Sequence, residues 1–340
     1  MGKTESSGGK RIGIIGAGSW GTALAIIAAR NRHHVTLWAR EEDVARGIQQ
    51  TRKNPFYLSQ FELPDAIHAT TSLAEAVAGT DFAIIVVPSH AMREVLAGVR
   101  HLLEPTTLVI SATKGVENGS LMRMSELIVD VLKERFEPRF VALSGPSFAL
   151  EVAKGYPTAL VAASTLPEWR EAVQRELSSN LFRIYTNSDV AGVELGGAVK
   201  NVVAIASGVV NGLGFGMNSV AAIITRGLAE MTRLALSQGA RPETLAGLAG
   251  LGDLVLTCTG ELSRNRRVGV ELGRGRKLPE ILSQTREVAE GVKTTRAVFE
   301  LGKRMNLDLP ITASIYALLY EDKPALDAAN ELMERPLKKE

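Results

Sequence analysis

The stretch Gly16-Ala17-Gly18-Ser19-Trp20-Gly21 decides the fold of this chain. It follows the apolar run Arg11–Ile15 and opens an alanine-rich run from Thr22 to Arg30, as a glycine turn between a buried strand and a helix does. The first glycine permits the tight turn, the second lets the backbone approach a pyrophosphate, and the third lets helix and strand pack closely. The helix N-terminus then faces the phosphate charge. In this context the motif predicts a dinucleotide site at Gly16, Gly18 and Gly21, although alone it also fits an ordinary glycine loop.

Length and composition narrow the class of protein. The chain has 340 residues, 45% of them hydrophobic, which allows a substantial core and indicates two domains. Its 39 basic residues nearly balance 37 acidic ones, so the overall charge gives no case for nucleic acid or an anionic membrane. The single cysteine, Cys258, excludes an internal disulfide and a multi-cysteine metal site, which fits a cytoplasmic protein. The histidines show no metal-ligand spacing, and we expect no metal cofactor.

The order of apolar runs predicts two structural halves. Up to about residue 187, short β-rich runs alternate with helical stretches, as in a parallel α/β sheet. The predicted strands after the glycine turn are Val35–Trp38, Phe82–Val87, Thr107–Ser111, Phe140–Leu143 and Thr158–Ala163. The predicted helices between them include Leu73–Ala78, Met92–Leu103 and Leu121–Phe136. From Asp189 onward, alanine, leucine and glycine at helical spacing replace the strand-like runs.

We therefore predict an α/β Rossmann-type N-terminal domain followed by an all-α C-terminal domain. The expected divisions are a disordered leader over 1–10, a dinucleotide-binding domain over 11–189, a helical substrate-binding domain over 190–333 and a charged tail over 334–340. Ligands of such sheets bind beyond the carboxyl ends of the strands, so the loops after each strand are where the chemistry is expected.

The residue after the second predicted strand bears on the choice of cofactor. Enzymes that prefer NAD usually carry Asp or Glu there, about twenty residues past the glycines, to accept hydrogen bonds from the ribose 2′-hydroxyl. This chain has Arg40, whose guanidinium can pair with a 2′-phosphate and so favours NADP(H). Glu41 and Glu42 leave NAD(H) open, and Arg40 also fits a solvated charge at a strand end.

Lys200 stands in the apolar, glycine-rich segment Gly196–Gly216. Because that segment also carries polar residues, it fits a buried helix better than a membrane span, and we expect no integral membrane protein. Burial favours the neutral amine and lowers the pKa of a lysine toward neutral pH, where a general acid/base works. A lysine that reaches solvent from a helix end is the alternative. Lys114, in a predicted strand-end loop, is a second acid/base candidate and also fits an anchor for an anion.

The segment Ser263-Arg264-Asn265-Arg266-Arg267 concentrates three arginines in four positions. Guanidinium groups bind phosphate bidentately and an asparagine amide adds a donor, so the segment predicts a phosphate site. With the nearby Gly273–Lys277 it also fits a nucleic-acid patch. Interleaved aromatic residues are missing, however, and we expect no nucleic-acid partner. A solvated basic face is the remaining alternative.

Eight segments, taken together and in order, closely resemble the bacterial-type NAD(P)-dependent glycerol-3-phosphate dehydrogenase family. They are Gly16–Thr22, Pro88–His90, Ala112–Gly115, Ser144–Ala149, Gly196–Asn201, Gly250–Thr259, Ser263–Arg267 and Val288–Gly291. The resemblance spans about Arg11 to Tyr320. It implies reversible reduction of dihydroxyacetone phosphate to sn-glycerol 3-phosphate, a precursor of phospholipid backbones, and it suggests a homodimer.

The resemblance also implies roles for individual residues. It makes Lys200 the proton-transferring group, with Arg264 and Asn265 on the substrate phosphate. The implied substrate-site residues are Lys114, Gly145, Ser147, Lys200, Asn201, Asp253, Thr257, Ser263, Arg264 and Asn265. Those implied for the cofactor, besides the glycines, are Ser19, Trp20, Arg40, Lys114, Ala149, Arg264, Val288 and Glu290. Trp20, Arg40 and Ser147 differ from the residues commonest in the family, and only Arg40 leaves the cofactor preference in doubt.

Two alternative hypotheses about function fit the same order of domains. A phosphogluconate or hydroxyacid dehydrogenase also has an α/β half followed by a helical half. A non-catalytic regulator that senses NADP would bind the cofactor without oxidising it. A regulatory function would not require a lysine inside the apolar Gly196–Gly216 segment.

Overall fold

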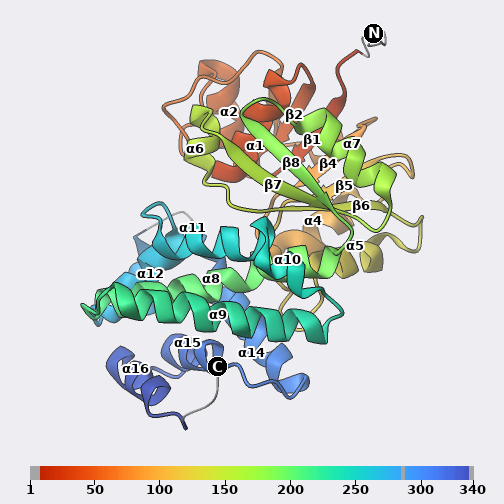
Figure 1. Ribbon diagram of the computed structural model, residues 1–340. Helices are drawn as coiled ribbons and strands as arrows, with labels where there is room; N and C mark the ends of the chain where they lie inside the picture. The colour runs from red at the N-terminus through yellow and green to blue at the C-terminus, as the bar shows by residue number, and fades with distance from the viewer. Residues whose placement is uncertain (1–7, 285–287, 337–340) are drawn as a thin grey trace.

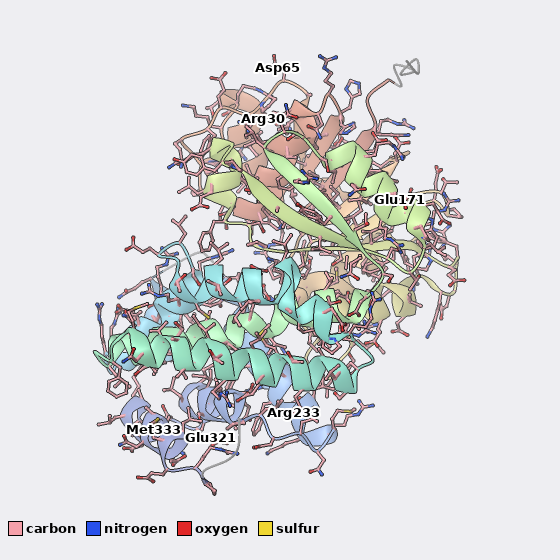
Figure 2. The ribbon with its side chains drawn as sticks, in the orientation of Figure 1. Arg30, Asp65, Glu171, Arg233, Glu321 and Met333 are labelled. Atoms are coloured by element: carbon pink, nitrogen blue, oxygen red, sulfur yellow. The ribbon has the colours of Figure 1, made fainter. Side chains whose placement is uncertain are left out.

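The computed structural model of the chain describes residues 8–284 and 288–336. Of the predicted leader only 8–10 is described, and of the predicted charged tail only 334–336; the remainder of both lies outside the described residues. Figure 1 shows a sheet with its covering helices in one half of the molecule and a group of helices in the other. This arrangement confirms the predicted fold class.

Eight strands form one sheet in the order β3-β2-β1-β4-β5-β6-β7-β8. Their bounds are β1 Arg11–Ile15, β2 His34–Trp38, β3 Ile67–Thr70, β4 Phe82–Ile85, β5 Leu108–Ser111, β6 Arg139–Ser144, β7 Thr158–Ala163 and β8 Phe182–Asn187. Ile12 and Ile14 pack into a core on one face of the sheet, and Ile15 packs into a second core on the other face. Burial on both faces explains the nearly continuous apolar strand sequences.

The helices of this half cover the two faces and connect the strands. They are α1 Ser19–Arg30, α2 Glu42–Thr51, α3 Leu73–Val77, the short 3-10 turn η1 Ser89–Ala91, α4 Met92–Val99, α5 Met124–Leu132, α6 Ala149–Lys154 and α7 Pro167–Leu177. The three helices predicted between strands are present but shorter than expected: each ends before its last predicted residue, and α5 also begins three residues after the predicted Leu121.

The expected parallel arrangement does not hold at the last two strands of the sheet. β7 pairs with β6 antiparallel and with β8 in parallel, so both run against the other six strands. The connection from β6 contains only α6, whose six residues span about 9 Å. The whole connection, residues 145–157, has 13 residues, close to the dozen or so that a crossover between parallel strands needs at least. The chain re-enters the sheet from the edge at which β6 ends.

Two strands escaped sequence prediction. β3 is a four-residue edge strand, too short to show a pattern. β8 alternates buried Phe182 and Ile184 with exposed Arg183 and Tyr185, which is the period of a half-buried strand. That alternation could have identified it.

The helices of the second half surround α8, Val190–Gly212. The others are α9 Met217–Ser237, α10 Pro242–Ala246, a π-helical turn η2 Leu248–Gly252, α11 Asp253–Thr259, α12 Arg264–Gly273, α13 Leu278–Ser283, α14 Glu290–Arg304, α15 Pro310–Tyr320 and α16 Ala325–Met333. By length and composition α8 could cross a membrane, but 94% of its most apolar stretch is buried inside the fold. It is the core helix of this half (Figure 1).

Helices α8 and α12 cross backbone against backbone. A Cβ added at Gly208 would lie 2.1 Å from the carbonyl oxygen of Arg266, and one added at Gly269 would lie 2.0 Å from that of Ile205. The same holds one turn further, at Gly212 and Gly273. Glycines at these positions let the two helices touch with no side chain between them, and this contact fixes where α12 begins.

We expect Gly269→Ala to destabilise the fold strongly. Its Cβ would overlap the main chain of Ile205, which cannot rotate away, so α12 must move. Overpacking of this kind costs about 2–3 kcal/mol. Urea unfolding measures the free energy of unfolding, and Gly216→Ala is the matched control because nothing lies within 4 Å of its added Cβ. Equal unfolding midpoints for the two variants would contradict the expected rigidity of the crossing.

Candidate active site

Lys200 lies near the middle of α8 with its ammonium group enclosed. The residue is 5% exposed, and its Nζ donates hydrogen bonds to Oδ1 of Asp253 and, over 2.8 Å, to Oγ1 of Thr257. The Thr257 hydroxyl donates in turn to the carbonyl oxygen of Asp253 at 2.6 Å. Asp253 opens α11 directly after the π-helical turn, a feature often found at functional sites.

A second ammonium group shares the same carboxylate. Lys114 Nζ donates to Oδ2 of Asp253 over 2.7 Å and to the carbonyl oxygen of Gly145 over 3.0 Å. Asp253 is 1% exposed, so one buried carboxylate faces two lysines. Burial is the main cause that lowers the pKa of Lys200 to about 7; the Asp253 charge opposes the shift and the Lys114 charge adds to it. An amine with this pKa can give or take a proton at neutral pH.

The sheet topology places Lys114 and Gly145 together. Lys114 follows β5 and Gly145 follows β6, and these neighbouring parallel strands end at the same edge. Gly145 has φ +140°, a conformation that suits glycine, and the Ser147 hydroxyl donates to its carbonyl oxygen over 3.0 Å. On α8, a Cβ at Gly197 would lie 2.5 Å from Oγ of Ser144, so this glycine lets α8 approach the edge of the sheet.

A second group of polar residues lies where α12 begins. Asn265 donates through Nδ2 to Oδ1 of Asn201 over 3.0 Å, and its Oδ1 accepts from the main-chain N of Gly291 over 2.9 Å. Ser263 caps α12, its hydroxyl accepting from the main-chain N of Arg266 over 3.2 Å. Arg264 is half-buried and its charge acts on Glu290. Asn201 stands next to Lys200 in α8, so the start of α12 adjoins the lysine pair.

The glycine turn has the form of a dinucleotide cradle. Gly16 has φ +123°, and a Cβ on Gly21 would lie 1.8 Å from the carbonyl oxygen of Gly16, so neither position admits a side chain. A Cβ on Gly18 would meet nothing within 4 Å, which leaves the backbone open to a ligand. Helix α1 starts at Ser19 with no side-chain cap and no acidic residue in its first turn. These residues fit a pyrophosphate.

The other residues predicted for the cofactor differ in burial and in their partners. Trp20 packs against the sheet core, and its buried Nε1 has no hydrogen-bond partner in the described part of the chain. Ala149 starts α6, which packs on α1. Val288 is exposed and lies two residues before the start of α14. Arg40 lies after β2 with a side chain that is 78% exposed and bonds to Oε1 of Glu41 over 2.6 Å.

Glu290 connects the two halves of the chain. Its Oε2 accepts a hydrogen bond from the Ser89 hydroxyl over 2.9 Å, from η1 to the first residue of α14. Burial raises the pKa of Glu290, and the Ser89 hydrogen bond opposes that shift. Ser89 belongs to the Pro88–His90 loop, but sequence reasoning gave this serine no role. Only the fold brings it to Glu290, 201 residues further along the chain.

His90 follows Ser89 in the chain and lies within the electrostatic reach of Lys293 and Arg40. Burial lowers its pKa first, and the charges of Lys293 and Arg40 lower it further. Within residues 8–284 and 288–336, no group of three or more His, Cys, Asp or Glu side chains could hold a metal ion.

Comparison with known proteins points to one family. Residues 11–170 match the family model of the NAD-dependent glycerol-3-phosphate dehydrogenase N-terminus, and residues 189–330 match that of its C-terminus. The chain is 54% identical over 331 residues to glycerol-3-phosphate dehydrogenase (NAD(P)+) of Geobacter sulfurreducens, covering 97% of this chain and 99% of that relative.

Two solved structures agree in fold and sequence. The crystal structure of glycerol-3-phosphate dehydrogenase from Coxiella burnetii superposes with a TM-score of 0.92 at 41% identity, over 96% of this chain and 99% of that one. Glycerol-3-phosphate dehydrogenase of Saccharomyces cerevisiae gives a TM-score of 0.81 at 27% identity, over 96% and 100%. The chain therefore belongs to the NAD-dependent glycerol-3-phosphate dehydrogenase family.

Proposed function

We propose that this chain catalyses the reversible NAD(P)H-dependent reduction of dihydroxyacetone phosphate to sn-glycerol 3-phosphate, the backbone of glycerophospholipids. The observation that carries the proposal is Lys200, a buried lysine on a carboxylate that it shares with Lys114. Beside it stands the Arg264–Asn265 segment, suited to a phosphate. A proton donor next to a phosphate anchor is what a small phosphorylated ketone requires.

Proton transfer is the task of Lys200. When bound, the nicotinamide cofactor supplies or accepts the hydride. The Lys200 ammonium gives a proton to the oxygen on C2 as the carbonyl becomes an alkoxide, and in the reverse direction its neutral amine accepts that proton. Asp253 holds the lysine through Oδ1, and Thr257, one turn further along α11, accepts a second hydrogen bond from it. Lys114, Gly145 and Ser147 border the same site and contact the substrate.

The substrate phosphate is held at the start of α12. Arg264 supplies a guanidinium and Asn265 an amide, with Ser263 and Asn201 ordering them. Charged hydrogen bonds to phosphate position C2 against the cofactor, so binding energy remote from the carbonyl serves the reaction.

For the cofactor we propose NADP(H) as the preferred form, with NAD(H) also accepted. The glycine cradle with Ser19 and Trp20 holds the pyrophosphate end. Arg40 exchanges its bond to Glu41 for the 2′-phosphate, in a region where the charge of Lys293 also acts. Ala149, Lys114, Arg264, Val288 and Glu290 line the path to the nicotinamide.

We expect Arg40→Glu to raise KM for NADPH about 10- to 100-fold, the value of one or two charged hydrogen bonds, and KM for NADH less than about threefold. Steady-state kinetics with both cofactors measures the two effects. Arg46→Glu is the matched control, since Arg46 pairs with Glu42 on the same surface through a comparable exposed ion pair. Equal changes in the two Michaelis constants would remove Arg40 from cofactor selection.

An NADPH-absorbance assay with dihydroxyacetone phosphate tests the function directly. We expect oxidation of NADPH that depends on this ketone and is slight with dihydroxyacetone. Activity on a phosphogluconate or a hydroxyacid, without activity on dihydroxyacetone phosphate, would favour the rival dehydrogenase. Binding of NADPH with no oxidation would favour the regulator.

The chain's surroundings are also part of the proposal. We propose a cytoplasmic protein, supported by its single cysteine, Cys258, which is a free, buried thiol. We also propose a homodimer, supported by the family to which the chain belongs. Sedimentation velocity measures the assembly, and a monomer at micromolar concentration would exclude the dimer.

A further inference from the structure

Glu194 of α8 makes hydrogen bonds into the first half of the chain. Its Oε1 accepts from the main-chain N of Ser125 over 2.7 Å, and its Oε2 accepts from the Ser125 hydroxyl over 2.6 Å and from Nη1 of Arg123 over 3.1 Å. The residue is 9% exposed. Every one of these donors lies at the start of α5.

The carboxylate does for α5 what an N-cap side chain does for an isolated helix. Arg123, the residue before α5, has no acceptor atom in its side chain and cannot cap the helix. A carboxylate at a helix N-terminus satisfies a free N–H group and meets the positive end of the helix dipole. Here the cap comes from a helix of the other half, so α5 and α8 are tied to each other.

The loop between β5 and α5 connects the hydrogen bonds of Glu194 to Lys114. The loop between β5 and α5 carries Lys114 at one end and Arg123 at the other, and it is closed by a bridge between Val116 and Arg123. Glu117 within it binds the Arg93 guanidinium with both oxygens, each over 2.9 Å. A displacement of Arg123 is therefore transmitted to Lys114.

Glu194 itself belongs to α8, the helix that carries Lys200. Glu194 and Lys200 are six residues apart in one helix, about 9 Å along its axis. Lys114 and Lys200 meet on the two oxygens of Asp253. We propose that Glu194 is a positioning residue for the reaction: by tying α8 to the loop of Lys114, it holds the two ammonium groups together on Asp253.

This inference rests on the proposed function. Its measurable consequence is a change in the pKa of Lys200. The groups that act on Lys200 are Asp253 and Cys258 from α11 and Lys114 from the loop; those that act on Glu194 are Arg123 and Glu126 from the start of α5. The charge of Lys114 lowers the pKa of Lys200. If the loop moves away, that repulsion weakens and the pKa of Lys200 rises.

The test is Glu194→Gln, compared with Glu126→Gln. Glu126 pairs with the same Arg123 over 2.7 Å and accepts from its main-chain N over 2.9 Å, but both residues lie at the start of α5. Glu126→Gln therefore weakens the same helix start without removing a bond to α8, which makes it the matched control. We expect Glu194→Gln to lower kcat about 5- to 50-fold, as a small misplacement of a reacting group does, and to change KM for NADPH by a smaller factor, since the glycine cradle is untouched. The midpoint of the pH profile of kcat should rise by about half a unit or more. The control should keep the wild-type profile.

A readout independent of turnover separates this inference from the proposed function. NMR of protein labelled with 13C at the lysine ε-carbons follows the titration of Lys200, assigned by its absence in Lys200→Met. An inactive wild-type enzyme would overturn the proposed function, and the titration would still judge Glu194. An unchanged Lys200 midpoint in Glu194→Gln overturns the inference, even if the variant unfolds at lower temperature. Should Glu194→Gln not fold, Ser125→Ala removes one of the bonds; a smaller shift in the same direction supports the inference, and a wild-type midpoint refutes it.

Discussion

We expect Lys200→Ala to retain NADPH binding and to lose turnover. The substitution removes the group that we propose as proton donor, and general acid catalysis contributes about 10²- to 10⁴-fold to a rate. The cofactor cradle belongs to other residues, from Gly16 to Gly21, so the Kd for NADPH should change little. Single-turnover kinetics and fluorescence titration with NADPH measure the two quantities.

The control for this variant is Lys133→Ala, which removes an exposed lysine paired with Asp130. Turnover near the wild-type level in Lys200→Ala would remove this lysine from the mechanism. Loss of NADPH binding in step with turnover would mean that the substitution disturbs the fold.

The pH dependence of the wild type follows from the same group. Because the pKa of Lys200 is lowered to about 7, its ammonium form predominates below that pH and its amine form above it. Ketone reduction needs the ammonium, so its kcat should fall as the pH rises through about 7. Alcohol oxidation needs the amine and should show the opposite slope. Profiles with the same slope in both directions would contradict the assignment.

Arg264→Ala should cost the enzyme most of its discrimination for the phosphate. A charged hydrogen bond is worth about 1.5–3 kcal/mol, which corresponds to a loss of about 10- to 150-fold in kcat/KM for dihydroxyacetone phosphate. Dihydroxyacetone, which has no phosphate, should react with wild type and variant at similar rates. The comparison of two substrates in two enzymes isolates the phosphate contribution from any effect on the cofactor.

The control is Arg274→Ala at the other end of α12, where an exposed arginine pairs with Glu271. An equal loss on both substrates in Arg264→Ala would place this arginine on the cofactor alone. An unchanged kcat/KM for the phosphorylated ketone would remove it from the site.

The parts of this fold that sequence could predict are those with a local cause. The glycine turn, the buried strands β1, β2, β4 and β5, and the apolar core helix are written in short patterns of the chain. The reversal at β7 was missed, because the direction of a strand depends on the length and path of its connection, which an apolar run does not reveal. A buried apolar strand has the same kind of sequence whether it pairs in parallel or antiparallel.

The candidate site can be predicted from the sequence to a similarly uneven extent. Lys200 is conspicuous as a charge in an apolar helix, and Arg264 as part of a basic cluster. The shared carboxylate of Asp253 joins Lys114 to Lys200 across 139 and 53 residues, and no spacing rule covers such separations. Ser89 and Glu194 were missed for a related reason: each is an ordinary polar residue in sequence, and its partner comes from the other half of the chain.

On the proposed roles of Lys200 and Arg264, the glycine crossing of α8 and α12 limits the length of the substrate that fits the site. The helix that carries Lys200 and the helix that begins with Arg264 touch through their main chains, so no side chain can shift to widen the gap between proton donor and phosphate anchor. A fixed gap admits one number of bonds between carbonyl oxygen and phosphorus. On the proposed roles, a homologue of the substrate with one more carbon in that stretch is refused by distance, with no group placed to repel it.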